Sequence, residues 1–319
     1  MPDVALMNTQ LQLEQLATDG IHLDLPQLLA YQRHHALLDL APKMAIQSKL
    51  AGSYLARSKG RGMEFDEVRH YQIGDDVRTI DWRVTARTGK VHTKLFREEK
   101  ERPVFILTDL SESMRFGTKL LLKSVQAAHL AALLAWHVRE TGDKLGGLIF
   151  SEQQLLELKP AARSQAVLRY LNALIKIQQN QGMAAESNLN HALGLMRRLA
   201  RPGSLLFVIS DFSTLDAQGL RHLQAMRQHN EIRCVHITDP LDLQLPLSAS
   251  GLAAVTDGQQ LKTLDLGSSS LKDSYKQQQS QWQQALQLNL KKLNCRYLEI
   301  SAALPLIEQL NRSWPDGEH

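Results

Sequence analysis

The sequence is poor in cysteine and has no long apolar segment. Only two of its 319 residues are cysteines, Cys234 and Cys295, and each lies in an apolar run. Two cysteines cannot supply the disulfide framework of a small secreted domain, so we expect two reduced core residues in a reducing compartment. The N-terminus lacks a basic segment followed by an apolar one, and the most apolar stretch, residues 130–138, is too short to cross a bilayer. We therefore expect a cytoplasmic protein with no membrane span.

Motifs of several enzyme classes are missing as well. None of the twelve histidines lies three or four residues from another, which excludes a helical zinc site of the His-x-x-x-His type. There is no Gly-x-Ser-x-Gly nucleophile elbow and no Gly-x-x-x-x-Gly-Lys-Ser/Thr phosphate-binding loop. Gly60 and Gly62 are followed by Phe65, where a dinucleotide-binding fingerprint has its third glycine. The sequence thus offers no support for an enzyme that hydrolyses nucleotides or uses a dinucleotide.

The composition is that of an ordinary globular protein with a mild excess of positive charge. Apolar residues make up 43% and charged residues 22%, so a chain of this length can bury a large core. There are 37 Lys and Arg against 33 Asp and Glu, a formal net charge of +4. This excess suits an acidic partner. The basic residues lack the interleaved aromatic residues of single-strand nucleic-acid binders, and we expect no nucleic-acid partner.

The chain divides into three segments that differ in the spacing of their apolar residues. Residues 1–58 are predicted to be an N-terminal helical segment, because leucines recur at helical spacing between residues 23 and 55. Residues 59–102 are predicted to form a small antiparallel β unit, since apolar and polar residues alternate over 80–87 and 91–95. Its carboxylates would either make a second acidic site or pair with arginines, and we predict pairing because the two sets match in number: Glu64, Asp75, Asp76 and Asp81 against Arg69, Arg78, Arg83 and Arg87.

The third segment, residues 103–319, alternates between short apolar runs and stretches with helical spacing. Runs typical of buried strands are residues 104–108, 145–150, 205–210, 234–238 and 296–300. Helices are predicted between them over residues 121–135, 163–177, 189–199 and 215–229. A hairpin over 252–266 and an amphipathic helix over 276–287 follow the fourth strand. This order predicts an α/β fold of the doubly wound, Rossmann type, with a mostly parallel sheet between two layers of helices.

Hydroxyl and carboxylate side chains follow two of these strands at their carboxyl ends, where ligands of open parallel sheets gather. Asp109, Ser111 and Ser113 come after the first strand, and Asp211 after the third. Ser187 precedes a predicted helix and would face the same edge as an N-cap. Such hard oxygens suit a small divalent cation, Mg²⁺ or Mn²⁺, with one coordination position open to an acidic group of a partner. The simpler alternative is that these residues only form turns and helix caps.

The same residues carry a resemblance to known families. Residues 109–113, Asp-Leu-Ser-Glu-Ser, resemble the Asp-x-Ser-x-Ser motif of von Willebrand factor A domains, which build a metal-ion-dependent adhesion site. The resemblance implies that Ser187 and Asp211 stand at the positions of that family's Thr and second Asp. Residues 74–82, which read Gly-Asp-Asp-Val-Arg-Thr-Ile-Asp-Trp, are similar to the signature of the domain-of-unknown-function 58 family, and Asp239-Pro240 also fits its pattern. Ser187 keeps the hydroxyl of the usual Thr without its methyl group.

The resemblance implies a von Willebrand factor A-like domain with a non-catalytic role. Proteins of this family are typically encoded beside MoxR-type AAA+ ATPases. This implies a metal-dependent adaptor that works with such an ATPase in maturing or remodelling a client protein that presents an acidic residue. Many relatives carry N-terminal membrane spans, and recruitment of this cytosolic version to membrane complexes stays open. Two alternatives also stay open: a metal-dependent hydrolase that uses the same crevice or the acidic β unit, and a scaffold whose site has lost its metal.

Overall fold

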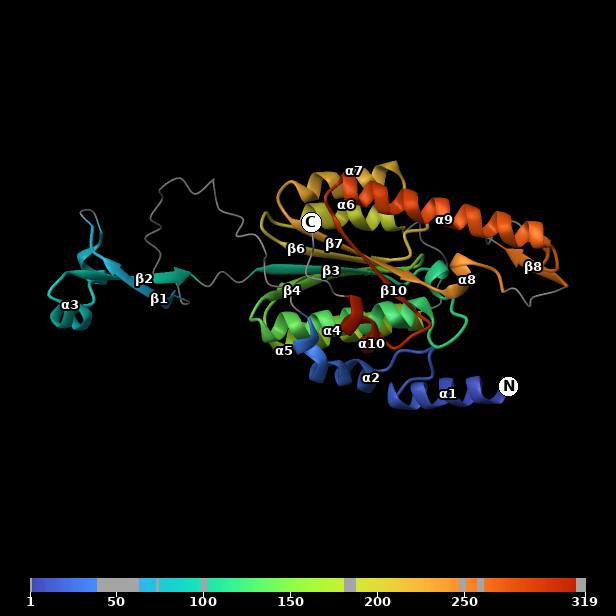
Figure 1. Ribbon diagram of the computed structural model, residues 1–319, viewed down its shortest axis with the longest axis horizontal. Helices are drawn as coiled ribbons and strands as arrows, with labels where there is room; N and C mark the ends of the chain where they lie inside the picture. Colours follow the sequence, from blue (N-terminus) through green and yellow to red (C-terminus); the bar gives the residue numbers. More distant parts are fainter. Residues whose placement is uncertain are drawn as a thin grey trace. The chain divides into compact units, whose positions relative to one another are not determined.

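The computed structural model describes residues 2–38, 63–72, 75–98, 102–180, 188–246, 251–256 and 261–313. The chain forms two compact units, one made of residues 1–41 and 102–319 and the other of residues 42–101. The larger unit contains the predicted α/β fold together with the N-terminal helices (Figure 1).

The larger unit is built around a six-stranded sheet with the strand order β10-β7-β6-β3-β4-β5. All neighbouring strands are parallel except β4 and β5. The strands are β3 (Pro103–Asp109), β4 (Lys144–Phe150), β5 (Leu155–Ala161), β6 (Leu205–Ser210), β7 (Glu231–Thr238) and β10 (Arg296–Ser301). Five of them match the apolar runs of the sequence, and the predicted doubly wound, mostly parallel sheet is confirmed. The antiparallel strand β5 was not predicted.

Helices cover both faces of this sheet (Figure 1). Along β3, Val104 and Ile106 belong to one core cluster, whereas Phe105 and Leu107 belong to the other. Because successive side chains of a strand point to opposite faces, the apolar run of β3 fills both cores. One face is covered by α4 (Lys123–Glu140), α5 (Arg163–Gln179) and α10 (Leu306–Ser313), and the other by α6 (Leu189–Leu199), α7 (Ala217–Arg227) and α9 (Ser269–Lys292).

The N-terminal segment packs across α4, and nearly every side chain of that helix is buried. His129 Nε2 of α4 lies 3.1 Å from Gln27 Oε1, and Trp136 Nε1 donates to Leu28 O at 3.2 Å. The segment therefore completes the core of the larger unit. Its described elements are α1 (Pro2–Gln15), α2 (Leu25–Ala30) and the 3-10 helix η1 (Tyr31–Leu37), and residues 39–58 of the predicted helical segment lie outside the described residues.

The smaller unit contains a small antiparallel sheet, as predicted, but its strands are β1 (Met63–His70), which was not predicted, and β2 (His92–Glu98). Between them lie the 3-10 helix η2 (Val77–Thr79) and the helix α3 (Trp82–Thr88), so the predicted strand over residues 80–87 is wrong. Asp81 caps α3 by accepting from the backbone N–H groups of Arg83 (3.0 Å) and Val84 (3.1 Å), and Gly89 ends the helix with a left-handed φ of 69°. These end signals outweigh apolar alternation in so short a segment.

The remaining elements are a hairpin and two short helices. β8 (Leu252–Thr256) and β9 (Leu261–Asp265) pair antiparallel, which confirms the predicted hairpin, and residues 257–260 between them lie outside the described residues. The 3-10 helix η3 (Glu112–Met114) follows β3, and α8 (Pro240–Leu243) follows β7. The predicted helix over 276–287 is the central part of α9. No helix of the described ranges is long and apolar enough to cross a membrane.

Candidate functional site

β3 and β6 are neighbours at the centre of the sheet, and the chain leaves them in opposite directions. From β3 it passes through α4 to β4 on one side, and from β6 through α7 to β7 on the other. The two helices lie on opposite faces of the sheet (Figure 1). This is the topological switch point, where open α/β sheets bind their ligands beyond the carboxyl ends of the strands. The same order, Asp-x-Ser, stands at the end of both strands: Asp109 is the last residue of β3 and Ser111 follows it, and Asp211 and Ser213 follow β6.

Asp109 ends β3 with a buried carboxylate that has no ion pair among the described residues. Only 2% of the residue is exposed. Its Oδ1 accepts from the Ser111 backbone N–H (2.9 Å), and its Oδ2 accepts from the Ser210 hydroxyl (2.6 Å). Burial, together with the negative charge of Asp211, raises the pKa of Asp109 to about 7 despite these hydrogen bonds. A cation beside Asp109 would favour its ionised form.

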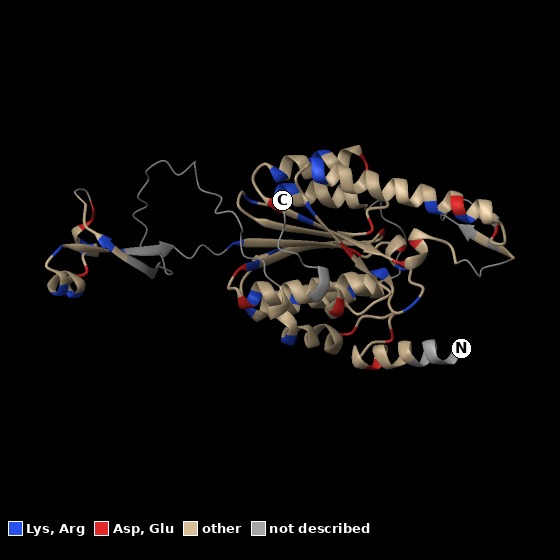
Figure 2. Cartoon of the chain, viewed as in Figure 1, with Lys and Arg blue, Asp and Glu red and all other residues tan. Residues whose placement is uncertain are grey.

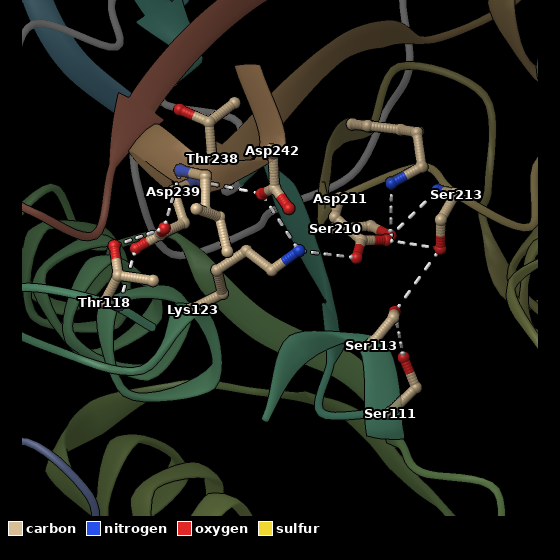
Figure 3. Close-up of polar contacts among 12 residues, drawn as sticks. Ser111, Ser113, Thr118, Lys123, Ser210, Asp211, Ser213, Thr238, Asp239 and Asp242 are labelled. Atoms are coloured by element: carbon tan, nitrogen blue, oxygen red, sulfur yellow. Dashed lines mark hydrogen bonds and ion pairs between the residues drawn. The ribbon is translucent and has the colours of Figure 1, made fainter. Parts of the chain in front are cut away.

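Three serine hydroxyls connect the two loops in a hydrogen-bonded chain (Figure 3). Ser113 Oγ lies 3.3 Å from Ser111 Oγ and 3.3 Å from Ser213 Oγ. Ser213 Oγ in turn donates to Asp211 Oδ1 at 2.8 Å. Ser213 was not predicted, although Asp-Phe-Ser at 211–213 repeats the Asp-x-Ser order of the first loop. Of the predicted ligands, Ser187 lies outside the described residues, and the structure brings together Asp109, Ser111, Ser113 and Asp211.

Lys123, at the start of α4, places a buried positive charge beside Asp211. Its Nζ lies 3.0 Å from Asp211 Oδ2 and 3.1 Å from Asp242 Oδ2, and 5% of its side chain is exposed. Burial alone would raise the pKa of Asp211, but the Lys123 ammonium and the Ser213 hydrogen bonds hold it below its ordinary value. Burial alone would lower the pKa of Lys123, yet the two carboxylates raise it. Both groups therefore stay ionised, and both oxygens of Asp211 are engaged.

A further set of contacts fixes the loop after β3 to the end of β7. Thr118 donates to Asp239 through its backbone N–H (2.9 Å) and through its hydroxyl (2.6 Å). Asp239 caps α8, and Asp242 accepts from the Asp239 backbone N–H at 2.9 Å. Because Asp242 also holds Lys123, the candidate site is continuous with α8 (Figure 3). Thr118, Lys123 and Asp242 were not predicted, since their partners lie as far as 121 positions away and no local pattern signals such contacts.

The chemistry of this donor set fits a small divalent cation. Two carboxylates and three hydroxyls are ligands that Mg²⁺ or Mn²⁺ accepts, with water in the remaining positions. Over the described parts of the chain, no three His, Cys, Asp or Glu side chains gather into a group that could hold a metal ion. A cation here would therefore depend on the serine hydroxyls as well as on Asp109 and Asp211.

Several known proteins are similar to this chain in sequence or in structure. Uncharacterized protein Mb1516 of Mycobacterium bovis is 30% identical to this chain over 224 residues, which cover 70% of this chain and 69% of the relative. The same values hold for uncharacterized protein Rv1480 of Mycobacterium tuberculosis. Among solved structures, BatB from Bacteroides thetaiotaomicron is 14% identical, with a TM-score of 0.42, over 63% of this chain and 90% of that one.

An aerotolerance-related membrane protein from Bacteroides fragilis is also similar, at 16% identity and a TM-score of 0.43, over 66% of this chain and 97% of that one. The family model described as "Protein of unknown function DUF58" matches residues 67–285, which is more than half of the chain. The match begins in β1, includes the signature at 74–82 and ends within α9. The chain belongs to the DUF58 family.

Proposed function

We propose that this protein is a non-catalytic, metal-dependent adaptor that binds other proteins at the ends of β3 and β6. The observation that carries the proposal is the chain of serine hydroxyls that runs from Ser111, whose backbone N–H binds the buried Asp109 carboxylate, to the buried carboxylate of Asp211. Lys123 lies between Asp211 and Asp242, whereas Asp109 has no positive partner among the described residues. Three carboxyl groups therefore share one ammonium, and a divalent cation beside Asp109 would complement the excess of acidic groups.

In such a site, some residues would bind the cation and others would orient these ligands. Mg²⁺ or Mn²⁺ bound by Asp109, Ser111 and Ser113 would offer an open coordination position to a carboxylate of a partner. The Ser210 hydroxyl orients the Asp109 carboxylate. Asp211, held by Lys123, contributes its charge and orients Ser213. Ser187 is proposed to complete the ligand set.

The partners follow from the family resemblance. We propose a MoxR-type AAA+ ATPase and a client protein that presents an Asp or Glu to the site, with the adaptor acting in maturation or remodelling of the client. Cys234 and Cys295 are free thiols in the core. Free thiols suit a reducing environment, and we propose a cytoplasmic location.

The test is capture of the ATPase and the client from native lysate by the wild-type chain and by Asp109→Ala, each with Mg²⁺ and with a chelator. Capture of the client is expected with the wild-type chain in Mg²⁺ and is expected to be lost in chelator and in Asp109→Ala. The matched control is Asp265→Ala, which removes an exposed carboxylate from β9 and should behave as the wild type. Titration of the purified proteins with Mn²⁺, followed by electron paramagnetic resonance, separates loss of the cation from loss of the partner.

Two outcomes would contradict the proposal. Identical partners in all four conditions would show that binding does not need a metal, as in the scaffold alternative. Turnover of a phosphoester or peptide substrate that disappears in Asp109→Ala would show a hydrolase that uses the same residues.

A further inference from the structure

The smaller unit carries the whole excess of positive charge in the chain. Residues 42–101 contain thirteen Lys and Arg against nine Asp and Glu, a net charge of +4. The remaining residues contain 24 of each sign, so their formal net charge is zero. Figure 2 shows basic residues on α3 of this unit. A partner attracted by the net charge of this protein would therefore be attracted to the smaller unit.

The three acidic residues between β1 and α3, Asp75, Asp76 and Asp81, are already engaged. Asp75 pairs with Arg69 at 2.7 Å, which confirms one of the ion pairs predicted from the sequence. Asp76 caps η2 by accepting from the Arg78 backbone N–H. Asp81 caps α3 and lies 3.8 Å from Lys94 Nζ. These carboxylates therefore cap η2 and α3 and pair with Arg69 and Lys94.

The other basic side chains of this stretch form no ion pair with the carboxylates whose positions the structure describes. Among the described side chains, the predicted ion pairs of Arg78, Arg83 and Arg87 are not found, because Asp76 and Asp81 cap helices. The side chain of Glu64, the fourth predicted acidic partner, lies outside the described ones. These three arginines and Lys90 are exposed. Arg83 and Arg87 stand four residues apart on α3, where like charges lie on one face and destabilise the helix. An acidic partner would relieve this repulsion.

Large apolar side chains are exposed in the same stretch. Trp82 is 69% exposed, Val77 61% and Val91 43%. Trp82 stands in the first turn of α3, directly before Arg83. Tryptophan and arginine are the residues enriched at the energetic centres of protein interfaces, because each offers a large contact area together with specific polar or charged contacts.

We propose that residues 77–91, the docking face, bind an acidic protein segment that carries a bulky apolar side chain. The four basic groups attract the acidic residues of that segment, and Trp82 with Val77 and Val91 takes up its apolar side chain. A phosphate backbone would meet the charges but would leave the valines uncovered, and one tryptophan offers no row of stacking positions for bases. The docking face does not depend on the metal site, and it provides the second surface that an adaptor needs.

The test measures the fluorescence anisotropy of a fluorescein-labelled peptide, made of Glu, Asp, Leu and Phe, on titration with the full chain. Trp82→Ala is expected to weaken binding at least about 30-fold, as expected for a tryptophan at the centre of an interface. Arg83→Glu with Arg87→Glu should also weaken it at least tenfold. The control pair Lys291→Glu with Lys292→Glu, exposed on α9, makes the same change in net charge and should have no effect. The titrations are made in chelator, so that the carboxylates of the peptide cannot bind a cation at the metal site, and failure here is distinct from failure of the metal site.

Three results would overturn the docking face. The first is equal affinity of the wild type and Trp82→Ala, and the second is an equal loss in the Lys291 and Lys292 variant, which would reduce the effect to net charge. The third is Trp82-dependent binding of polyuridylate, or of vesicles of anionic phospholipid, that is tighter than binding of the peptide. Acrylamide quenching, with Trp82→Phe to isolate the signal, adds a check on the free chain. A protected Trp82 would mean that the chain itself covers this face, and would also overturn the proposal.

Discussion

Replacing Lys123 by Met tests the charge balance around Asp211. The change keeps most of the side-chain volume but removes the ammonium that lies 3.0 Å from Asp211 and 3.1 Å from Asp242. Asp211, whose side chain is 7% exposed, is then a buried charge without a partner. Removing one member of a buried ion pair costs about 3–5 kcal/mol, because the remaining charge keeps its desolvation penalty. We expect the free energy of unfolding to fall by that amount.

The assay is urea unfolding followed by circular dichroism at neutral pH, in chelator and in Mg²⁺. Lys119→Met, which removes an exposed lysine from the loop before α4, is the matched control and should change the free energy of unfolding by less than about 0.5 kcal/mol. Adding Asp211→Asn to Lys123→Met should recover most of the loss, since the unpaired charge is removed. A loss below about 1 kcal/mol for Lys123→Met, or no recovery in the double variant, would refute this reasoning.

Three further predictions concern other groups of the larger unit. Burial lowers the pKa of His129 to about 3, so the unfolded chain takes up a proton below about pH 6.5 and the folded one does not. Stability is then complete above pH 6.5 and falls by up to about 5 kcal/mol between pH 6.5 and 3, and His129→Gln should remove this part of the pH dependence of unfolding. Asp109 has its pKa raised to about 7 by burial and by Asp211, so its contribution to stability declines as the pH rises from about 4 to 7. Asp109→Asn in chelator at pH 8 should therefore raise the free energy of unfolding, by up to about 4 kcal/mol, and should abolish any stabilisation by Mn²⁺. In Gly147→Ala the new Cβ would clash with the Ile106 carbonyl oxygen and lie 2.6 Å from the Tyr170 ring. Urea unfolding should show a loss of about 1–3 kcal/mol.

Most elements of the larger unit could be predicted because their signals are local. β6 coincides with the apolar run 205–210, and α6 with the helical spacing over 189–199. All six residues of β6 are buried, because the strand contributes side chains to the cores on both faces of the sheet. Its sequence is therefore continuously apolar up to Ser210. In α6, Leu189, Leu193 and Met196 are buried at the spacing of a single helix face.

β5 and α3 could not be predicted in this way, for different reasons. β5 is a half-buried edge strand that contains Pro160, and it is defined by its antiparallel pairing with β4 rather than by its own composition. In α3 the apolar alternation does not describe burial, since Trp82 faces solvent. The caps Asp81 and Gly89 were the better signal.

The candidate site was predictable only where its residues follow one strand. The order of Asp109, Ser111 and Ser113 places them in one loop, and Asp211 follows from the position of the next apolar strand in the sheet. The role of Lys123 could not be seen, because a lysine in the first turn of a helix is ordinarily exposed. Only the pairing of β3 with β6 brings Asp211 to it across 88 positions of sequence.

The central place of β3 and β6 also determines when the site appears during synthesis. Asp109 and its hydrogen-bond partner Ser210 are 101 positions apart. A ribosome that adds about 5–20 residues per second needs roughly 5–20 s to pass from one to the other. During this interval β4 can pair with one edge of β3, while the edge that will receive β6 stays open to other strands. A chain released before β6 is made would therefore expose a bare apolar strand edge instead of a weakened site. The complete candidate site is therefore found only in chains in which β6 has paired with β3.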